Sequence, residues 1–412
     1  MRNLTLDALV RILILVAIAV RMMLSAGLLN NLAGYTSGQG SIIGRFHPAT
    51  YLLVLPIVLF LLRGSFRLVP PLDVAILLSM AAASIAAYNG GLNMACVIVD
   101  VGITSMIVAR MLIVYGPSLQ RRAIILMTSI SLFNLILVII EKLRNQAIFP
   151  RDRQELFFRP QGLFDHPLFV GYICCFLMWA VLRSQLRPAR ALLIGIGLWL
   201  EVVLVSVRLP LLLASLVLGL QIIATGRDRL ARIGTALVAA AVLPLLASGA
   251  AAAGWLDRFF TIGLFDEQSA ASRINVFDIL SRMSNAQIAF GMDQGSIDAA
   301  MRILKMDAIE SSFIAYTITA GMIVAILVYA ANIIAFFPVI RRDLLFTTIF
   351  LSMTLGSIAL STKTATMVVV FAAAASSYGR PRRPTEPPFF QDTPFQNTSG
   401  LGATSLASPN QQ

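Results

Sequence analysis

Residues 123–141 read AIILMTSISLFNLILVIIE, an almost entirely apolar run that follows the pair Arg121–Arg122. A helix needs about 20 consecutive apolar residues to cross the hydrocarbon core of a bilayer, so this run predicts a transmembrane helix. Similar runs occur along most of the chain, at residues 9–29, 48–63, 69–88, 93–115, 167–183, 189–206, 209–225, 233–253, 312–339, 344–360 and 364–379. The sequence therefore predicts an all-α, polytopic membrane protein with about twelve transmembrane helices.

The composition excludes most classes of soluble protein. Of the 412 residues, 58% are hydrophobic and 13% are charged, whereas a typical soluble domain is about half apolar and a quarter charged. A chain with this balance has too few polar residues to cover a globular enzyme in water, and it is too apolar for a disordered protein. Cys96, Cys174 and Cys175 lie inside apolar runs, and they predict neither a disulfide framework nor a metal site.

Positive charge follows the ends of the predicted helices. The net charge is +12, but the arginines stand in ones, twos and threes between apolar runs, which indicates topology signals and not a nucleic-acid-binding face. Most of them fall in alternate connections, at Arg2, Arg11, Arg63, Arg67, Arg121, Arg122, Arg183, Arg187, Arg190, Arg227, Arg229, Arg232, Arg341, Arg342, Arg380, Arg382 and Arg383. This alternation predicts a bacterial inner-membrane protein with both termini in the cytoplasm.

The same pattern predicts how the chain is divided. Residues 1–379 form the transmembrane domain, and residues 380–412, rich in proline and polar residues, form a disordered cytoplasmic tail. Two long connections on the outer side, 142–166 and 254–311, are predicted periplasmic loops. The shorter loop favours an anionic ligand, because it contains Lys142, Arg144, Arg151, Arg153 and Arg159. The longer loop is also partly basic, but a loop of that length translocates whatever its charge, so both readings stay open.

Polar residues inside predicted spans are functional candidates, because they are costly in lipid. Asp100, Asn134 and Glu201 are of this kind. For each of them a polar contact inside the helix bundle is an equally good explanation. His47 and His166 both precede a proline at the outer start of a span, and no phosphate-binding glycine loop or nucleophile elbow is found.

Three outward segments form an ordered pattern. The first contains Arg159, Gly162, His166, Pro167 and Gly171, the second contains Ser206 and Arg208, and the third contains Arg273, Gly291 and Gly295. In this order, and over residues 150 to 340, the segments resemble the O-antigen ligase/polymerase superfamily, which includes the Wzy-type exopolysaccharide polymerases. Members have an Arg…Gly…His/Asn-Pro…Gly stretch, a Ser-x-Arg turn between two spans, and a large periplasmic loop with a leading arginine.

The chain departs from the ligase pattern at one position. Ligases of the superfamily usually have a His-Asn pair where this chain has Glu310-Ser311. The acidic residue argues against a ligase-type histidine mechanism and favours the exopolysaccharide polymerase branch. Pro210 is also unusual, because a small residue commonly follows the arginine of the Ser-x-Arg turn.

The resemblance implies a glycosyltransferase that uses a polyprenyl-pyrophosphate-linked glycan as donor and a sugar hydroxyl as acceptor, at the periplasmic face. Arg208 and Arg273 would contact the pyrophosphate, since a guanidinium meets phosphate oxygens with a bidentate fork. Glu310 would act as base toward the acceptor hydroxyl. The other substrate-binding candidates are Arg151, Arg153, Arg159 and His166.

No metal or other cofactor is implied, because pyrophosphate is already a good leaving group. The expected partners are membrane lipids and the lipid-linked glycans, with a flippase and a chain-length regulator as further candidates and no nucleic acid. Two alternatives stay open. One is a ligase that moves finished glycan to a lipid or protein acceptor, and the other is a transporter or flippase for lipid-linked saccharides, which should show paired broken helices.

Overall fold

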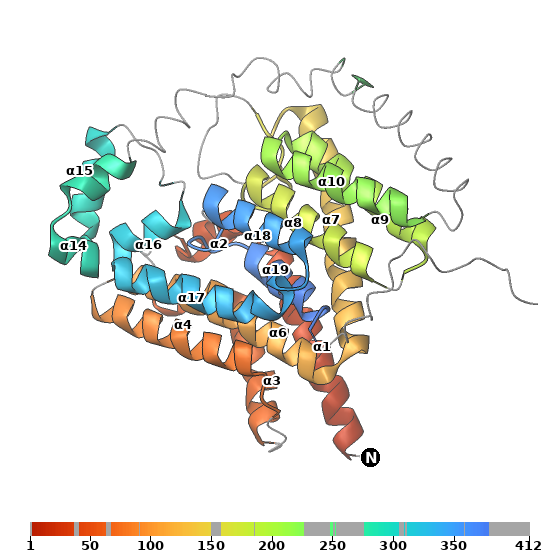
Figure 1. Cartoon of the computed structure of the whole chain (residues 1–412), viewed down its shortest axis with the longest axis horizontal. Coiled ribbons are helices and arrows are strands. Elements are labelled where there is room, and N and C mark those ends of the chain that lie inside the picture. Colours follow the sequence, from red (N-terminus) through yellow and green to blue (C-terminus); the bar gives the residue numbers. More distant parts are fainter. Residues whose placement is uncertain are drawn as a thin grey trace, which may run out of the picture. The chain divides into compact units, whose positions relative to one another are not determined.

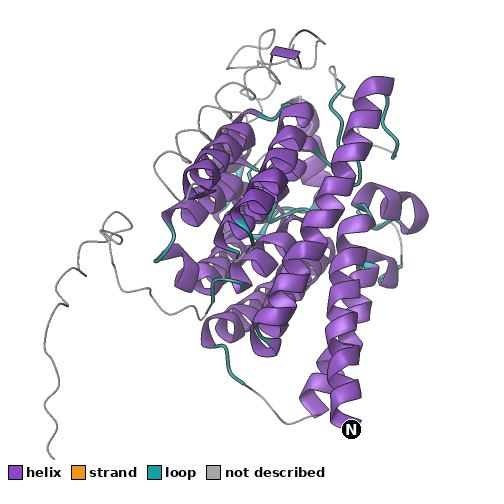
Figure 2. Cartoon of the chain, turned by 90° about the vertical axis from the view of Figure 1, so that its right-hand side faces the viewer, coloured by secondary structure: helices purple, strands orange, loops and turns teal. Residues whose placement is uncertain are grey.

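The computed structural model describes residues 2–36, 41–62, 67–89, 91–149, 158–184, 186–225, 276–304, 311–357 and 359–378, together with positions 248, 249, 252 and 309. The chain divides into the unit Met1–Tyr378 and the segment Gly379–Gln412, and the predicted tail 380–412 lies outside the described residues. The predicted span 233–253 lies almost entirely outside them as well. The described residues form helices joined by loops, without a strand among them (Figure 2), which confirms the all-α class.

The first half of the chain contains α1 (Arg2–Met23), α2 (Ala26–Ala33), the 3₁₀ turn η1 (Ile43–Arg45), α3 (Pro48–Leu62), α4 (Pro70–Tyr88), α5 (Leu92–Val97), the π-helix η2 (Ile98–Ile103), α6 (Thr104–Tyr115), α7 (Pro117–Arg144), α8 (Pro167–Arg183) and α9 (Pro188–Val205). The second half contains α10 (Arg208–Thr225), α14 (Asn285–Phe290), α15 (Gln294–Ile303), α16 (Ser312–Ala320), α17 (Met322–Ile340), α18 (Leu344–Gly356) and α19 (Thr366–Ala375). Figure 1 shows their arrangement.

Five stretches of the described chain are long and apolar enough to cross a membrane: α4, the continuous α5–η2–α6, α7, α9 and α17. The bent pair α1–α2 makes a sixth when it is counted as one span. The helices α3, α8, α10, α18 and α19 contain shorter apolar stretches of 10–17 residues, which in α10 is Arg208–Ala224. The structure is therefore that of an α-helical protein with several potential membrane spans, and the predicted number of twelve stays a prediction.

The shorter helices α8 and α19 lie in the interior of the bundle. Nearly every residue of α8 from Pro167 to Val181 is buried, and all ten residues of α19 are buried. A helix that is apolar on all sides is surrounded either by protein or by lipid, and these two helices are surrounded by protein. Trp179 of α8 illustrates the packing, because its ring lies 4.9 Å from that of Phe346 while its indole N–H donates to Asp343 at 3.0 Å.

The first predicted span, 9–29, is wrong at its C-terminal end. Helix α1 ends at Met23, and α2 leaves it at an angle of 85°. Ser25 starts the second helix, because its hydroxyl accepts the backbone N–H of Leu28 at 3.1 Å. Gly34 ends it with φ +64°, a left-handed conformation that glycine adopts without strain.

The predicted span 312–339 is interrupted at Gly321, which separates α16 from α17. The helical segment 276–304, part of the predicted loop 254–311, packs against this break. The N–H of Met292 donates to the carbonyl of Ile318 at 2.7 Å. A Cβ placed on Gly321 would lie 2.1 Å from the carbonyl oxygen of Ala289, and Gly321 has φ +97°. A glycine at this point therefore permits both the backbone turn and the close approach of α14.

We expect Gly321→Ala to destabilise the protein by about 2 kcal/mol or more, because the methyl group meets backbone atoms and the positive φ disfavours a side chain. Thermal unfolding in detergent measures the change, and proteolysis of 276–304 should become faster. Gly219→Ala on α10 is the control, because a Cβ there has no neighbour within 4 Å. Equal stability of the two variants would contradict the argument.

The last two predicted spans, 344–360 and 364–379, are also shorter in the structure. Helix α18 ends at Gly356 and α19 begins at Thr366. At 1.5 Å per residue, the ten residues of α19 reach about 15 Å, half of the hydrocarbon thickness. The described residues of the connection between these helices, 357 and 359–365, are mostly buried.

The helix ends form two groups that follow the predicted alternation of sides. At the arginine-rich ends, Arg11 of α1 bonds Ser118 of α7, Arg110 of α6 pairs with Asp73 of α4, and Arg183 of α8 pairs with Asp343 before α18. At the opposite ends, Arg21 bonds the carbonyl of Thr364, Gly27 donates to Asp165, and Ser312 donates to Ser357. We refer to these as the inner end and the outer end.

This grouping predicts how single cysteines react with a membrane-impermeant thiol reagent. Starting from a chain without Cys96, Cys174 and Cys175, a cysteine at exposed Arg122 should react only after the membrane is opened. A cysteine at Asp298 should react in intact spheroplasts, because α15 belongs to the predicted periplasmic loop. Reaction of both cysteines in intact spheroplasts, or of neither, would contradict the predicted sides.

Candidate functional site

Four of the seven predicted site residues lie outside the described residues: Arg151, Arg153, Arg273 and Glu310. Arg159, His166 and Arg208 are described, and all three lie at the outer end. Arg208 is the first residue of α10. It follows Ser206, which ends α9 with φ +55°. The predicted Ser-x-Arg turn is therefore a tight reversal between two helices.

Helices α8 and α10 meet closely just inside this turn. A Cβ placed on Gly171 would lie 2.6 Å from Cβ of Pro210 and 2.7 Å from Cγ2 of Val207. Glycine at 171 and proline at 210 are therefore complementary, since the ring fills space that a side chain on Gly171 would need. This contact accounts for the unusual proline after the arginine.

Helix α18 ends beside the first turn of α10. A Cβ placed on Gly356 would lie 3.7 Å from Cδ2 of Leu209, the residue after Arg208, and 3.5 Å from the hydroxyl of Tyr172. The same hydroxyl donates to the carbonyl of Ser352 at 2.9 Å. The C-terminal end of α18 thus lies next to the first turn of α10.

The start of α16 packs against the residues that follow α18. The hydroxyl of Ser312 donates to the carbonyl of Ser357 at 3.0 Å and accepts the N–H of Leu360 at 3.2 Å. Tyr316 donates to the carbonyl of Leu360 at 2.6 Å. Glu310 precedes Ser312 by two positions in the chain. The sequence neighbours of Arg208 and of Glu310 are therefore joined through the end of α18.

The segment 158–166, which contains Arg159 and His166, is held in place by hydrogen bonds to side chains of α7. The carboxylate of Glu141 accepts the backbone N–H groups of Gln161 at 2.7 Å and Gly162 at 3.0 Å. Asn134 accepts the N–H of Leu163 at 2.5 Å through its side-chain oxygen. A Cβ on Gly162 would lie 2.1 Å from that oxygen, and its φ is +57°, so glycine is required here.

Glu201 and Asn134 make a polar contact inside the bundle, one of the two explanations that the sequence left open. Glu201 is fully buried on α9, and its carboxyl group accepts hydrogen bonds from Asn134 at 2.8 Å and from Ser131 at 3.0 Å. Asn134 also donates to the carbonyl of Gln161 at 3.3 Å. Glu201 therefore supports the outer segment 158–166 through Asn134.

His166 has a structural role at the start of α8. Its Nδ1 accepts the N–H of Leu168 at 3.1 Å, which caps the helix. The preceding Asp165 accepts the N–H of Gly27 at 2.8 Å, in the first turn of α2. The pair thus ties the segment 158–166 to α2 and α8.

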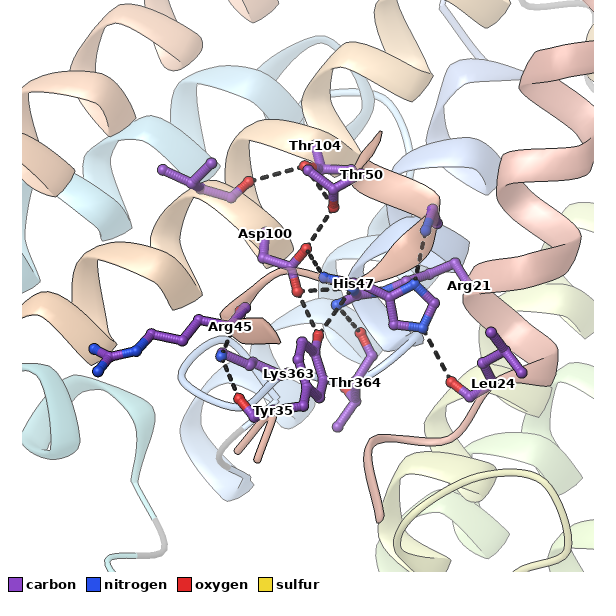
Figure 3. Close-up of polar contacts among 12 residues, drawn as sticks. Arg21, Leu24, Tyr35, Arg45, His47, Thr50, Asp100, Thr104, Lys363 and Thr364 are labelled. Atoms are coloured by element: carbon purple, nitrogen blue, oxygen red, sulfur yellow. Dashed lines mark hydrogen bonds and ion pairs between the residues drawn. The ribbon is translucent and has the colours of Figure 1, made fainter. Parts of the chain in front are cut away.

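Asp100 is the centre of a second polar cluster, which joins α1, α3 and the π-helix η2 (Figure 3). Arg21 donates to one carboxylate oxygen at 2.8 Å, together with the hydroxyl of Tyr35. The other oxygen accepts the N–H of His47 at 3.1 Å and the hydroxyl of Thr50. Both charged groups are almost completely buried, so the ion pair depends on these hydrogen bonds.

Lys363 and Thr364, in the connection between α18 and α19, complete the cluster. Arg21 donates to the carbonyl of Thr364 at 3.1 Å. The ammonium of Lys363 donates to the carbonyls of Tyr35 at 2.6 Å and Arg45 at 2.7 Å, and it lies 4.4 Å from the centre of the Tyr35 ring. Burial lowers the pKa of Lys363. The cluster therefore joins the N-terminal segment to the connection between α18 and α19.

His47 is neutral in this cluster. Its Nδ1 accepts the N–H of Ala49 and its Nε2 donates to the carbonyl of Leu24, both at 3.1 Å. Burial, together with the charge of Arg21, lowers the pKa of His47 to about 4. Next to the cluster is a cavity of about 10 Å³ lined partly by Ser25 and Asp165, which has room for about one water molecule.

The sequence pattern singled out Asp100 and His47 but not their partner Arg21. Arg21 stands inside the predicted span 9–29, and an intramembrane charge of this kind signals a buried partner. Tyr35 and Thr50 gave no such signal, because neither is costly in lipid or unusual near a helix end.

Among the described residues, no group of three or more histidine, cysteine, aspartate or glutamate side chains could hold a metal ion. Comparison of the chain with protein-family models, with curated proteins and with solved structures finds no match.

Proposed function

We propose that the chain is a polysaccharide polymerase that joins polyprenyl-pyrophosphate-linked oligosaccharide repeat units at the periplasmic face of the inner membrane. The observation that carries the proposal is the meeting of α10, α18 and α16 at the outer end. Leu209, next to Arg208, lies beside Gly356, and Ser357 bonds Ser312, two positions after Glu310. The sequence neighbours of an arginine and of a glutamate thus meet at this end, and these two residue types would suit a lipid-linked donor and a sugar acceptor.

In the proposed reaction, the acceptor hydroxyl oxygen attacks the anomeric carbon of the donor. The bond between that carbon and the pyrophosphate oxygen breaks, and the lipid pyrophosphate leaves with the bonding electrons. Arg208 and Arg273 stabilise the charge that develops on the leaving group. Glu310 takes the proton of the acceptor hydroxyl, so charge and atoms balance without a metal or a nucleotide.

The segment 158–166 supplies a wall for this site. Glu141 and Asn134 hold its backbone from α7, and Asp165 holds the start of α2. A wall held at several points can present Arg159 to an anionic donor with little loss of conformational entropy on binding. The basic residues Arg151 and Arg153 precede it in the chain and would add attraction for the same donor.

Purified full-length protein in lipid vesicles, supplied with a lipid-linked repeat unit, tests the proposal. The expected product is a ladder of lipid-linked chains of increasing length. Transfer of glycan only to an added lipid-core or protein acceptor would identify a ligase. Unchanged single repeats, with donor bound and all acceptors present, would contradict both activities.

A transporter of lipid-linked saccharides is a second candidate, and two broken helices favour it. The pair α1–α2 bends by 85°, and α16 is separated from α17 at Gly321. Interrupted helices commonly form transporter sites. Asp100, however, bonds His47 and Tyr35 in outer loops, whereas transporter sites lie near the bilayer midplane. Movement of labelled lipid-linked repeats across vesicles, without lengthening, would decide for this candidate.

A further inference from the structure

An apolar groove lies between α4 and α17 at the inner end of the bundle. Its volume is about 310 Å³, and it is lined by Pro70, Pro71, Val74, Ile333, Ile334 and Phe337. This size is at the lower end of the range for ligand pockets, which begins at roughly 300 Å³. All six residues are apolar, and Val74, Ile333 and Phe337 are about half exposed. The groove therefore suits a hydrocarbon chain better than any polar ligand.

Positive charge lies where this groove reaches the helix ends. The guanidinium of Arg341, at the C-terminal end of α17, is 5.7 Å from the centre of the Phe337 ring. Arg67 precedes Pro70 by three positions, and its side chain is exposed. Both arginines belong to the ends that the positive-inside pattern assigns to the cytoplasm. A ligand with its chain in the groove would thus have its head group beside Arg341, with Arg67 three positions before the groove residue Pro70.

The two acidic residues at the ends of the groove helices, Asp73 in the first turn of α4 and Asp343 after α17, pair with other arginines. Asp73 pairs with Arg110 at 2.5 Å, and Asp343 pairs with Arg183 at 2.7 Å. No carboxylate in the described ranges lies within salt-bridge distance of Arg341. Its charge is available to an anion that comes from outside the chain.

We propose that this groove binds an anionic phospholipid of the cytoplasmic leaflet, with one acyl chain between α4 and α17 and the phosphate at Arg341. A cation at the membrane surface contributes about 1 kcal/mol to the binding of anionic lipid, which corresponds to about fivefold in affinity. The acyl chain provides contact area but no preference between head groups, so Arg341 determines the selectivity. This site is separate from the proposed glycosyltransferase site at the outer end.

Binding of phosphatidylglycerol and of phosphatidylcholine to the purified full-length protein in detergent tests the proposal. Native mass spectrometry counts the bound lipids, and the wild type should prefer phosphatidylglycerol. Arg341→Gln should bind phosphatidylglycerol about fivefold more weakly, with little change for phosphatidylcholine. Ile333→Trp should weaken the binding of both lipids, because the indole fills the groove. High salt should reduce only the preference between them.

Arg122→Gln on α7 is the matched control, since Arg122 is exposed at the same end and does not line the groove. It should keep the wild-type preference. An equal loss in Arg122→Gln would show general surface attraction and would overturn the site. Unchanged binding in Arg341→Gln would do the same, as would unchanged binding in Ile333→Trp. If Ile333→Trp does not fold, Val74→Trp, which fills the groove from α4, gives the same reading.

Discussion

Arg208→Lys should lengthen lipid-linked glycan at least about a hundredfold more slowly than the wild type. Lysine keeps the charge, but it loses the two parallel N–H donors that match a phosphate group. Loss of one preorganised donor at a developing negative charge typically costs a factor of about 10² to 10³. The ladder assay in vesicles measures the rate, and Arg273→Lys should behave in the same way.

Arg190→Lys is the control for this series, because Arg190 is exposed on α9 at the opposite end of the bundle. Its ladder should equal that of the wild type. Glu310→Gln keeps shape and hydrogen bonding but loses basicity, so it should accumulate single repeats while still binding donor. Full ladders from both lysine variants would remove the pyrophosphate role, and a full ladder from Glu310→Gln would remove the base.

Asp100→Leu should produce the largest loss of stability among single substitutions at the outer end. It leaves the guanidinium of Arg21 buried without its carboxylate partner. Breaking a buried ion pair from one side typically costs about 3–5 kcal/mol, because the remaining charge is uncompensated. Thermal unfolding of the purified protein in detergent, with lipid content held constant, measures the change.

The double variant Arg21→Met/Asp100→Leu should recover much of that loss, since it removes both charges together. Asp73→Leu is the matched control, because the Asp73 side chain is 20% exposed while that of Asp100 is fully buried. It should lose less stability than Asp100→Leu. A double variant no more stable than Asp100→Leu alone would show that the cluster is not held by this charge pair.

The residue pattern predicted the helical class and the grouping of helix ends. Long apolar runs and the arginines between them are local signals, so they can be read without knowledge of the packing. The approach of Leu209, which follows Arg208, toward the residues that follow Glu310 could not be predicted in this way. It depends on α18, whose end at Gly356 lies beside Leu209.

The helix boundaries predicted from the sequence were wrong where contacts with other segments of the chain interrupt an apolar run. Residues 9–29, apart from Arg11 and Arg21, and residues 312–339 are mostly apolar, and neither run predicts a break. The structure nevertheless ends α1 at Met23 and α16 before Gly321. At these breaks Ser25 caps α2, whose Gly27 donates to Asp165, and Gly321 permits the close approach of α14. The sequence also could not predict that α8 and α19 lie in the interior of the bundle, because an apolar helix in protein and one in lipid have the same composition.

The sequence by itself determined that this chain folds as apolar helices with arginine-rich ends, because burial in lipid and the sidedness of charge act on each segment separately. The tertiary structure alone decided which polar groups meet. Arg21, Tyr35 and Asp100 come from separate segments, and their hydrogen bonds exist only after α1 and η2 have packed together. Contacts between segments distant in the chain depend on the packing of whole helices, which no local pattern of residues specifies.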